Sequence, residues 1–351
     1  MESLKNKYKG RGLCGLRNRG NTCFINSATQ CMSNVLLLTE YILENDFTNL
    51  NTNDSQSLHM SVVNNYKDLI DKIWHNNNAV IAPNAFLAAL VRLSMTENCA
   101  IQFDNSQQDA QEFLVFLIDT LHTALAREVN ITINGVVENE IDQMALESMK
   151  NWKIYFKSNY SKIIDIFYGQ LVSSLTCQEC GYVSRAYDPI CHFSLPIPEG
   201  SQHDIGDCWE LFNSIEELDE TNRWKCDECK DYRPATKQIN IWKSPSIMIV
   251  VLKRFKKQST GGNSHKNNAF VNFSTDRIDL SQYCVGYDRD ASVYKLCGVV
   301  NHIGDINSGH YFAYCLNGDG KWYYYNDDNV TEISANNIVT PQAYCLFYEK
   351  V

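Results

Sequence analysis

Two pairs of cysteines with the same short spacing restrict the fold of this chain more than any other feature. Cys177 and Cys180 form one CxxC pair, Cys226 and Cys229 form a second, and residues 181–225 lie between the pairs. This spacing lets two thiolates occupy adjacent corners of a zinc tetrahedron, and two such pairs complete a closed four-thiolate site. The sequence therefore predicts a zinc ribbon, in which two distant hairpins each contribute two ligands and the metal stabilises the fold without taking part in catalysis.

Redox chemistry and disulfide bonding are the alternative uses of these cysteines. A thioredoxin-type motif requires a βαβ context, which is missing from the pattern around both pairs. Disulfide frameworks are typical of short secreted chains, whereas this chain has 351 residues and a polar, basic start with no apolar signal segment behind it. We therefore expect the 14 cysteines to be thiols or metal ligands in an intracellular protein, cytoplasmic or nuclear.

The charge balance bears on the partners that a zinc ribbon could serve. A nucleic-acid adaptor needs a basic surface, but the formal net charge is −10 and no lysine or arginine cluster adjoins either CxxC pair. No apolar run reaches the roughly 18 residues that span a bilayer. The sequence thus argues against nucleic acid and membrane as partners and is compatible with a basic peptide.

The apolar spacing changes along the chain from helical to extended. Helical spacing recurs in 24–35, 62–74 and 113–125, the last of them after a capping-box pattern at Ser106–Asp109. Extended patterns begin at about residue 165 and continue in 241–255, 293–300, 311–316, 321–325 and 343–348. The intervening polar segments are expected to be loops, together with a polar lead: 1–12, 44–56 and 75–78. A helical first part and a β-rich second part predict an α+β fold.

Cys23 occupies the position with the strongest chemical setting. It follows the turn-rich Gly20–Thr22 at the start of a predicted helix, where backbone amides and the helix dipole favour a thiolate. Asn18 can direct an amide donor to the same place, and a thiolate with such a donor is half of an acyl-transfer site. Taken alone, a cysteine near a helix start is more often a small, packed apolar residue.

His310 can supply the other half of the site. It begins a predicted strand that leads to a turn signal at Asn317–Gly320 and then to a second aromatic strand. If residue 316 faces residue 321, His310 lies opposite Asp327, and a one-residue bulge would bring Asn326 there instead. A neighbouring amide or carboxylate would hold the imidazole tautomer, although an isolated hairpin histidine is more often structural.

Blocks along the chain also follow one another in the order of a known family: Gly15–Ser27, Gln108–Phe113, the two CxxC pairs, Val251–Phe255, Gly309–Tyr314, Trp322–Tyr323, Asn326–Asp327 and Ala343–Tyr348. Together they resemble the ubiquitin-specific proteases, which are papain-like cysteine deubiquitinases, over residues 13–349. The resemblance implies a single catalytic domain at 13–351, after the lead at 1–12. It implies a helical thumb at about 13–130, zinc-ribbon fingers at about 165–240 and a palm at about 241–351.

The resemblance also implies the roles of individual residues. Cys23 would be the nucleophile, His310 the general base and acid, and Asn326 the residue that orients the histidine, with Asp327 as a polar neighbour. Asn18 would contribute to the oxyanion hole. The four cysteines Cys177, Cys180, Cys226 and Cys229 would hold a structural Zn²⁺ ion.

Ubiquitin or ubiquitinated proteins would be the substrates of a monomeric enzyme, and the resemblance places further residues near the ubiquitin tail. Asp109 would grip the tail, which carries arginines, although an aspartate at a helix start is also a common cap. His302 matches a second histidine near the oxyanion region, and a structural role is the alternative. Residues 256–268 would form a mobile loop by the cleft. A catalytically silent ubiquitin-binding scaffold with the same fold is the rival function.

Overall fold

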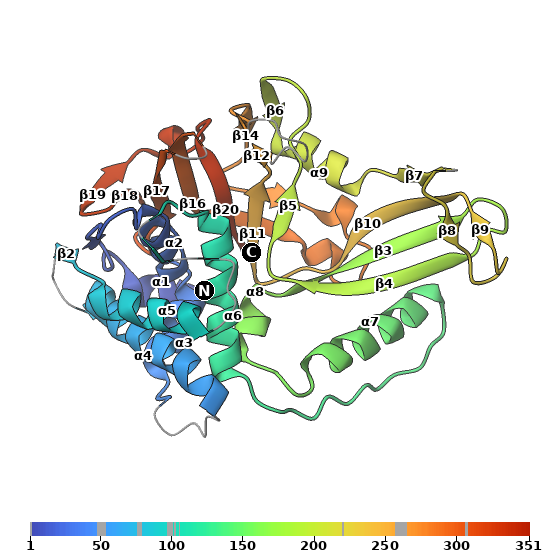
Figure 1. The fold of residues 1–351 in the computed structure, drawn as a ribbon, viewed down its shortest axis with the longest axis horizontal. Helices are drawn as coiled ribbons and strands as arrows, with labels where there is room; N and C mark the ends of the chain where they lie inside the picture. Colours follow the sequence, from blue (N-terminus) through green and yellow to red (C-terminus); the bar gives the residue numbers. More distant parts are fainter. Residues whose placement is uncertain are drawn as a thin grey trace.

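Helices make up most of the N-terminal part of the chain (Figure 1). The computed structural model describes residues 2–47, 54–75, 79–96, 101, 103, 104, 106–219, 221–256, 265–305 and 308–351. The helices of this part are α1 (Glu2–Tyr8), α2 (Cys23–Ser33), α3 (Leu36–Glu44), α4 (Asp54–His75), α5 (Asn84–Thr96) and α6 (Ala110–Leu125). The three predicted helices are confirmed as α2, α4 and α6, while α1 and α5 were not predicted.

Helix α1 lies in the segment that the sequence marks as a polar lead. Its one buried residue, Tyr8, is fully covered and packs edge-on against Trp74 of α4 at a ring distance of 5.0 Å. Lys7 pairs with Glu40 of α3 at 2.8 Å. The mostly polar α1 is therefore fixed to the helical part by a single aromatic anchor and a surface ion pair.

The predicted cap of α6 is displaced along the chain. Asp109, and not Ser106, is the N-cap residue, because its side chain accepts a hydrogen bond from the backbone amide of Gln111 at 2.7 Å. Ser106 instead accepts a hydrogen bond from the side chain of Gln108 at 2.6 Å. The predicted capping box is thus wrong in position, because α6 begins at Ala110 and Asp109 is the residue directly before it.

An eight-stranded sheet packs against these helices and corresponds to the expected palm. Its strand order is β19-β18-β17-β16-β20-β11-β5, with β15 paired to β16. The strands are β5 (Phe193–Leu195), β11 (Ile247–Leu252), β15 (Ile278–Asp279), β16 (Val293–Gly304), β17 (Gly309–Leu316), β18 (Trp322–Asn326), β19 (Asn329–Ile333) and β20 (Ala343–Lys350). The extended patterns predicted for the second half of the chain are confirmed in β11, β16, β17, β18 and β20.

Both faces of this sheet are covered, which explains the unbroken apolar run of β11. Ile247, Ile249 and Val251 belong to the core shared with the helices, whereas Met248, Val250 and Leu252 belong to a second core on the other face. The second core includes α9 (Ile205–Asn213). A strand buried on both faces needs apolar residues at every position rather than at alternate ones.

A four-stranded sheet extends away from the palm and corresponds to the expected fingers (Figure 1). Its order is β4-β3-β10-β7, and the strands are β3 (Gly169–Cys177), β4 (Val183–Ile190), β7 (Glu216–Leu218) and β10 (Ala235–Lys243). The short pair β8 (Trp224–Lys225) and β9 (Tyr232–Arg233) lies at its far end. Within the range expected for the fingers, β5 and α9 instead pack into the palm, because their apolar residues Phe193 and Trp209 join the second core.

The remaining elements are short, apart from one helix that the sequence analysis did not assign, α7 (Glu140–Phe156), which lies along β4. They are α8 (Lys162–Phe167), the parallel pairs β1 (Gly15–Leu16) with β2 (Val80–Ile81) and β6 (Gln202–Asp204) with β14 (Phe270–Asn272), the antiparallel pair β12 (Phe255–Lys256) with β13 (His265–Lys266), and three 3-10 turns, Ser281–Tyr283, Arg289–Ala291 and Ala335–Asn337. Most of the expected loop at 256–268, residues 257–264, lies outside the described residues.

Two further expectations concern membranes and disulfides. Among the helices of the described ranges, none combines the length and the apolar character required to cross a bilayer. Every cysteine within those ranges is a free thiol. The prediction of thiols rather than disulfides is therefore confirmed for this part of the chain.

Candidate active site and metal centre

Cys23 is the first residue of α2, and its side chain is 4% exposed. Burial raises the pKa of its thiol above the ordinary value and the Asp327 carboxylate raises it further, while the backbone amides of Tyr311 and Phe24 lower it. The net shift is upward. The helix start alone therefore does not make Cys23 a thiolate, contrary to the sequence-based expectation, and a nearby base is needed to remove its proton.

His310 and Asn326 face one another across β17 and β18. Nε2 of His310 lies 2.6 Å from Oδ1 of Asn326. An amide oxygen can only accept a hydrogen bond, so Nε2 is the donor, and in the neutral imidazole the lone pair then lies on Nδ1. This contact brings Asn326 to the imidazole and leaves Nδ1 as the basic atom.

The predicted register of this hairpin is wrong by one residue. The amide of Asn317 donates to the carbonyl of Lys321 at 2.9 Å, and Leu316 pairs with Trp322. The turn therefore has three residues and ends at Gly320, whose φ of 81° suits glycine. Because Leu316 pairs with Trp322, each residue of β17 pairs one position later in β18 than predicted. Continued to His310, this register no longer places Asp327 opposite it.

Asp327 connects the hairpin to the segment that carries Cys23. It follows β18 with a φ of 48°. Its Oδ2 accepts from Nδ2 of Asn18 at 3.0 Å, and its Oδ1 accepts from Nδ2 of Asn26 at 2.7 Å. Its backbone oxygen accepts from the amide of Leu16 at 2.8 Å. Three hydrogen bonds thus connect the residue after β18 to β1, to the loop before α2 and to α2 itself.

The Asn18 amide is held in one orientation. Its Oδ1 accepts hydrogen bonds from the backbone amides of Gly20 at 3.0 Å and Thr22 at 3.2 Å, and its Nδ2 donates to Asp327. Nδ2 carries two hydrogens, so the second remains for another acceptor. The structure therefore gives Asn18 an oriented amide donor in the loop that leads to Cys23.

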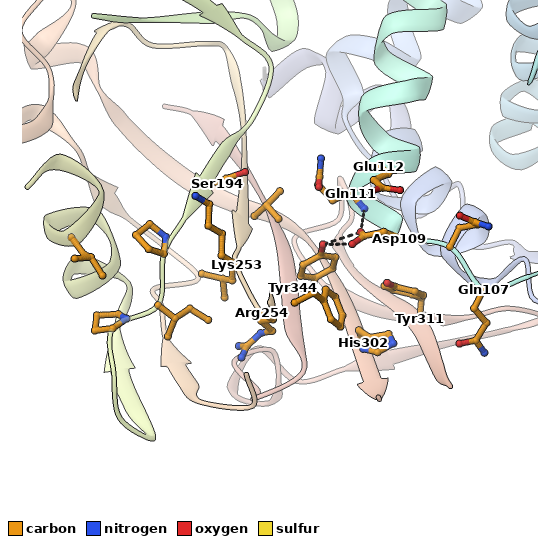
Figure 2. A pocket seen from close by; sticks show the side chains of 18 of the residues that line it. Gln107, Asp109, Gln111, Glu112, Ser194, Lys253, Arg254, His302, Tyr311 and Tyr344 are labelled. Carbon is orange, nitrogen blue, oxygen red and sulfur yellow. Dashed lines mark hydrogen bonds between the residues drawn. The ribbon is translucent and has the colours of Figure 1, made fainter. Parts of the chain in front are cut away.

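A cavity of about 870 Å³ opens beside the start of α6 (Figure 2). Asp109 and Tyr344 meet at its wall, where the Tyr344 hydroxyl lies 2.8 Å from both carboxylate oxygens. Burial raises the pKa of Tyr344, so its phenol donates the hydrogen bond. Asp109 therefore combines its helix-capping role with a place on the cavity wall, and both alternatives considered for it remain compatible with its position.

His302 lies on β16 and lines the same cavity, but only 2% of it is exposed. Its ring packs against Tyr311 at 4.5 Å and Phe255 at 5.2 Å. Burial lowers its pKa to about 4, and the positive charge of Lys266 acts in the same direction. His302 is therefore neutral at physiological pH and forms part of the packing beneath the cavity.

The four cysteines of the two CxxC pairs converge at the far end of the finger sheet. Their sulfur atoms all lie within 4.8 Å of one another, with 4.0 Å between Cys177 and Cys229 and 3.6 Å between Cys180 and Cys226. Zinc–sulfur bonds of about 2.3 Å at tetrahedral angles place sulfur atoms about 3.8 Å apart. The donor set therefore fits one tetrahedral metal ion.

The backbone of the two CxxC turns prepares this arrangement. The residue after each pair adopts a left-handed conformation, with a φ of 73° at Gly181 and 58° at Lys230. The first cysteine of each pair then donates its amide across the turn, Cys177 to Tyr182 at 2.9 Å and Cys226 to Asp231 at 3.0 Å. The backbone amide of Cys180 helps to lower the pKa of Cys177 to about 7, whereas the neighbouring cysteines raise the pKa of Cys229.

The amide side chains of α2 have structural roles that were not predicted from the sequence. Every residue of this helix is buried, and Asn26 donates both to Asp327 and to the carbonyl of Leu16. Gln30 donates to the carbonyl of Cys14 at 2.7 Å. The available signal was the recurrence of Asn26, Gln30 and Asn34 at four-residue intervals, which places three amides on one side of α2 and its C-cap.

Comparisons of sequence give one consistent result. The family described as "Ubiquitin carboxyl-terminal hydrolase" matches residues 14–348. Human ubiquitin carboxyl-terminal hydrolase 2 is 36% identical over 351 residues, 98% of this chain and 56% of the relative. Human ubiquitin carboxyl-terminal hydrolase 21 is 33% identical over 361 residues, 97% of this chain and 62% of the relative. The chain thus spans less than two thirds of the length of these relatives.

Solved structures with a similar fold support the same grouping. A yeast SAGA DUBm structure superposes with a TM-score of 0.74 at 25% identity, covering 98% of this chain and 70% of that chain. A SAGA DUB module bound to ubiquitin aldehyde gives a TM-score of 0.72 at 26% identity, with 98% and 70% of the respective chains covered. The fold of this chain is thus similar to the fold of these structures over nearly its whole length.

Proposed function

Since this chain belongs to the ubiquitin carboxyl-terminal hydrolase family, we propose that it is a thiol-dependent deubiquitinase. It hydrolyses the peptide or isopeptide bond that follows the C-terminal glycine of ubiquitin. The observation that carries the proposal is the contact of 2.6 Å between His310 Nε2 and Asn326 Oδ1. This contact occupies Nε2 and leaves Nδ1 of His310 as the base. The next residue of the same strand, Tyr311, interacts with the Cys23 thiol through its backbone amide.

The reaction begins with proton transfer. Nδ1 of His310 takes the proton of the Cys23 thiol, and the thiolate attacks the carbonyl carbon of the terminal glycine. The second hydrogen of Asn18 Nδ2 stabilises the oxygen that becomes negative, a contribution whose loss typically costs about 100- to 1,000-fold in rate. His310 then protonates the leaving amine, and water, deprotonated at the same nitrogen, hydrolyses the thioester.

Asp327 contributes by fixing Asn18. One oxygen of its carboxylate accepts a hydrogen bond from the side-chain amide of Asn18, and the other accepts one from the side-chain amide of Asn26. An oxyanion donor acts most strongly when it is oriented before the charge develops, because no reorganisation is then needed during the reaction. Asp327 therefore acts as a positioning residue for Asn18, while Asn326 orients His310.

The cavity beside α6 accommodates the substrate tail. Besides Lys253 and Arg254, three carboxylates line it, Asp109, Glu112 and Glu199. They suit a tail whose arginines precede two glycines. Two residues without side chains before the scissile bond allow a narrow approach to Cys23, which excludes other sequences.

The metal at the four cysteines is zinc in this proposal. Cys177, Cys180, Cys226 and Cys229 would hold it as thiolates and, because all four positions are filled, it stabilises the finger tip and takes no part in hydrolysis. Elemental analysis of protein purified without added zinc is expected to give one zinc ion per chain. A content well below one equivalent would contradict the assignment.

A ubiquitin probe with a C-terminal electrophile tests the catalytic proposal. The intact protein is expected to form a covalent adduct with one probe molecule, and Cys23→Ala is expected to form none. Cys191→Ala is the matched control, because the sulfur of Cys191 lies 3.7 Å from the imidazole of its neighbour His192 and this variant should still react. Absence of an adduct with the intact protein, or an adduct that survives Cys23→Ala, would refute the proposal. A bound but unreactive probe would favour the silent scaffold.

A further inference from the structure

Gln107 makes a two-bond contact with the backbone beside His310. Its Nε2 donates to the carbonyl of Gly309 at 2.8 Å, and the amide of Gly309 donates back to its Oε1 at 2.7 Å. We propose that this clamp is a positioning element of the active site, which holds the start of β17 so that His310 stays aligned with Cys23. The inference rests on the proposed hydrolase function and adds a residue to it.

The clamp replaces a missing strand partner. On one side, β17 pairs with β16 as far as Gly304 opposite Gly309. On the other side, its pairing with β18 ends at Ala313 opposite Tyr325, which leaves the first residues of β17 beyond the β18 ladder. A primary amide offers the same donor and acceptor as a peptide group. Gln107 therefore satisfies both backbone groups of Gly309 in place of a strand residue.

The local chain needs such a restraint. A Cβ atom at Gly309 would lie 2.1 Å from Nε2 of His302, so this position excludes a side chain and carries the backbone freedom of glycine. The preceding turn is closed by a hydrogen bond from the Asp305 amide to the Ser308 carbonyl at 2.9 Å. Since His310 is the next residue, unrestrained motion at Gly309 would pass directly to the imidazole.

Gln107 connects the segment before α6 with the palm sheet. It lies two residues before the Asp109 cap of α6, whereas Gly309 belongs to the palm sheet. Figure 2 shows it at the same end of the cavity as Tyr311 and His302. The clamp thus fixes the catalytic strand to the helical part that carries Cys23. A displacement of about 1 Å in a catalytic group can cost about 100-fold in rate.

Kinetics of Gln107 variants test the clamp. Gln107→Ala removes both bonds, and Gln107→Glu keeps an acceptor for the Gly309 amide but loses the donor to its carbonyl. The matched control is Gln143→Ala, which removes an exposed glutamine that contacts Glu147 on α7. The assay measures kcat and KM on ubiquitin with a fluorogenic C-terminal amide, after titration of the active fraction with the electrophilic probe. We expect kcat to fall about 10- to 100-fold in Gln107→Ala and less in Gln107→Glu, with KM within about threefold.

Hydrogen exchange of the Gly309 amide gives a second measurement that does not depend on activity. It should be slow in the wild-type protein and faster in both Gln107 variants, while exchange at Ala313 stays unchanged. A kcat of Gln107→Ala within twofold of wild type, a loss confined to KM, or an unprotected Gly309 amide in the wild type would overturn the proposal. If Gln107→Ala does not fold, Gln107→Glu and the exchange data decide. An inactive wild type with a protected Gly309 amide would instead refute the hydrolase function.

Discussion

Substitution of Asp109 separates two roles that one carboxylate combines. Asp109 caps α6 through the Gln111 amide at 2.7 Å and accepts the Tyr344 hydroxyl at 2.8 Å, and it lines the proposed site for a cationic tail. Asp109→Ala removes the cap, the acceptor and the charge together. Asp109→Asn keeps a good cap and an acceptor but removes the charge. The two variants therefore report on stability and on substrate binding separately.

The structure sets the size of each effect. Loss of an N-cap side chain costs about 1 kcal/mol, and leaving the Tyr344 hydroxyl, in a residue that is 3% exposed, without its acceptor costs about 1–3 kcal/mol. We expect Asp109→Ala to lower the free energy of unfolding by about 2–4 kcal/mol, and Asp109→Asn by less than about 1 kcal/mol. A hydrogen bond to a charged group contributes about 1.5–3 kcal/mol, so losing the carboxylate should raise KM about 10- to 150-fold in both variants.

Urea unfolding and steady-state kinetics on ubiquitin with a fluorogenic C-terminal amide measure these quantities. Asp204→Asn is the matched control, because Asp204 caps α9 outside the residues that line the cavity, and its KM should equal that of the wild type. A KM of Asp109→Asn within twofold of the wild-type value would refute the role of Asp109 in binding a cationic tail. A loss of unfolding free energy below about 1 kcal/mol in Asp109→Ala would refute the energetic argument from the cap and Tyr344.

Three further outcomes are expected. Asn326→Ala removes the acceptor of His310 Nε2 and should lower kcat about 100- to 10,000-fold, whereas Asn326→Asp should retain much of the activity; equal losses would contradict the orienting role. Cys226→Ser, or treatment with a zinc chelator, should lower the thermal midpoint and release the metal, and an unchanged midpoint would contradict a structural site. Burial lowers the pKa of His302 to about 4, so below its ordinary value of 6.5 the unfolded chain binds a proton that the folded protein does not. The free energy of unfolding should therefore fall by up to about 3 kcal/mol as the pH drops from about 6.5 to 4. His302→Gln should reduce this slope in urea unfolding, and identical slopes would exclude the explanation.

Much of the fold could be predicted because its signals are local. The apolar spacing of α2, α4 and α6 and the extended runs of β11 and β16 identify elements whose neighbours in sequence share a buried face. Helices α5 and α7 were not assigned, and α1 lies in a polar segment that only the burial of Tyr8 anchors. Local patterns also misplaced the cap of α6, because a short window does not distinguish Ser106 from Asp109 as the residue that meets the free amides.

The candidate site, like the fold, could be predicted only in part from the sequence. The sequence alone determined the chemical groups: a cysteine at a helix start, a histidine before a turn, an adjacent amide and carboxylate, and four cysteines at metal-binding spacing. Only the tertiary structure decided which groups meet. A three-residue turn at Gly318–Gly320 shifted the register. The Asn326 side chain contacts His310, while Asp327 contacts Asn18 and Asn26. Gln107 reaches Gly309 across 202 positions of the chain. Such contacts depend on where separate elements pack, and side chains brought together by packing leave no periodic trace in the sequence.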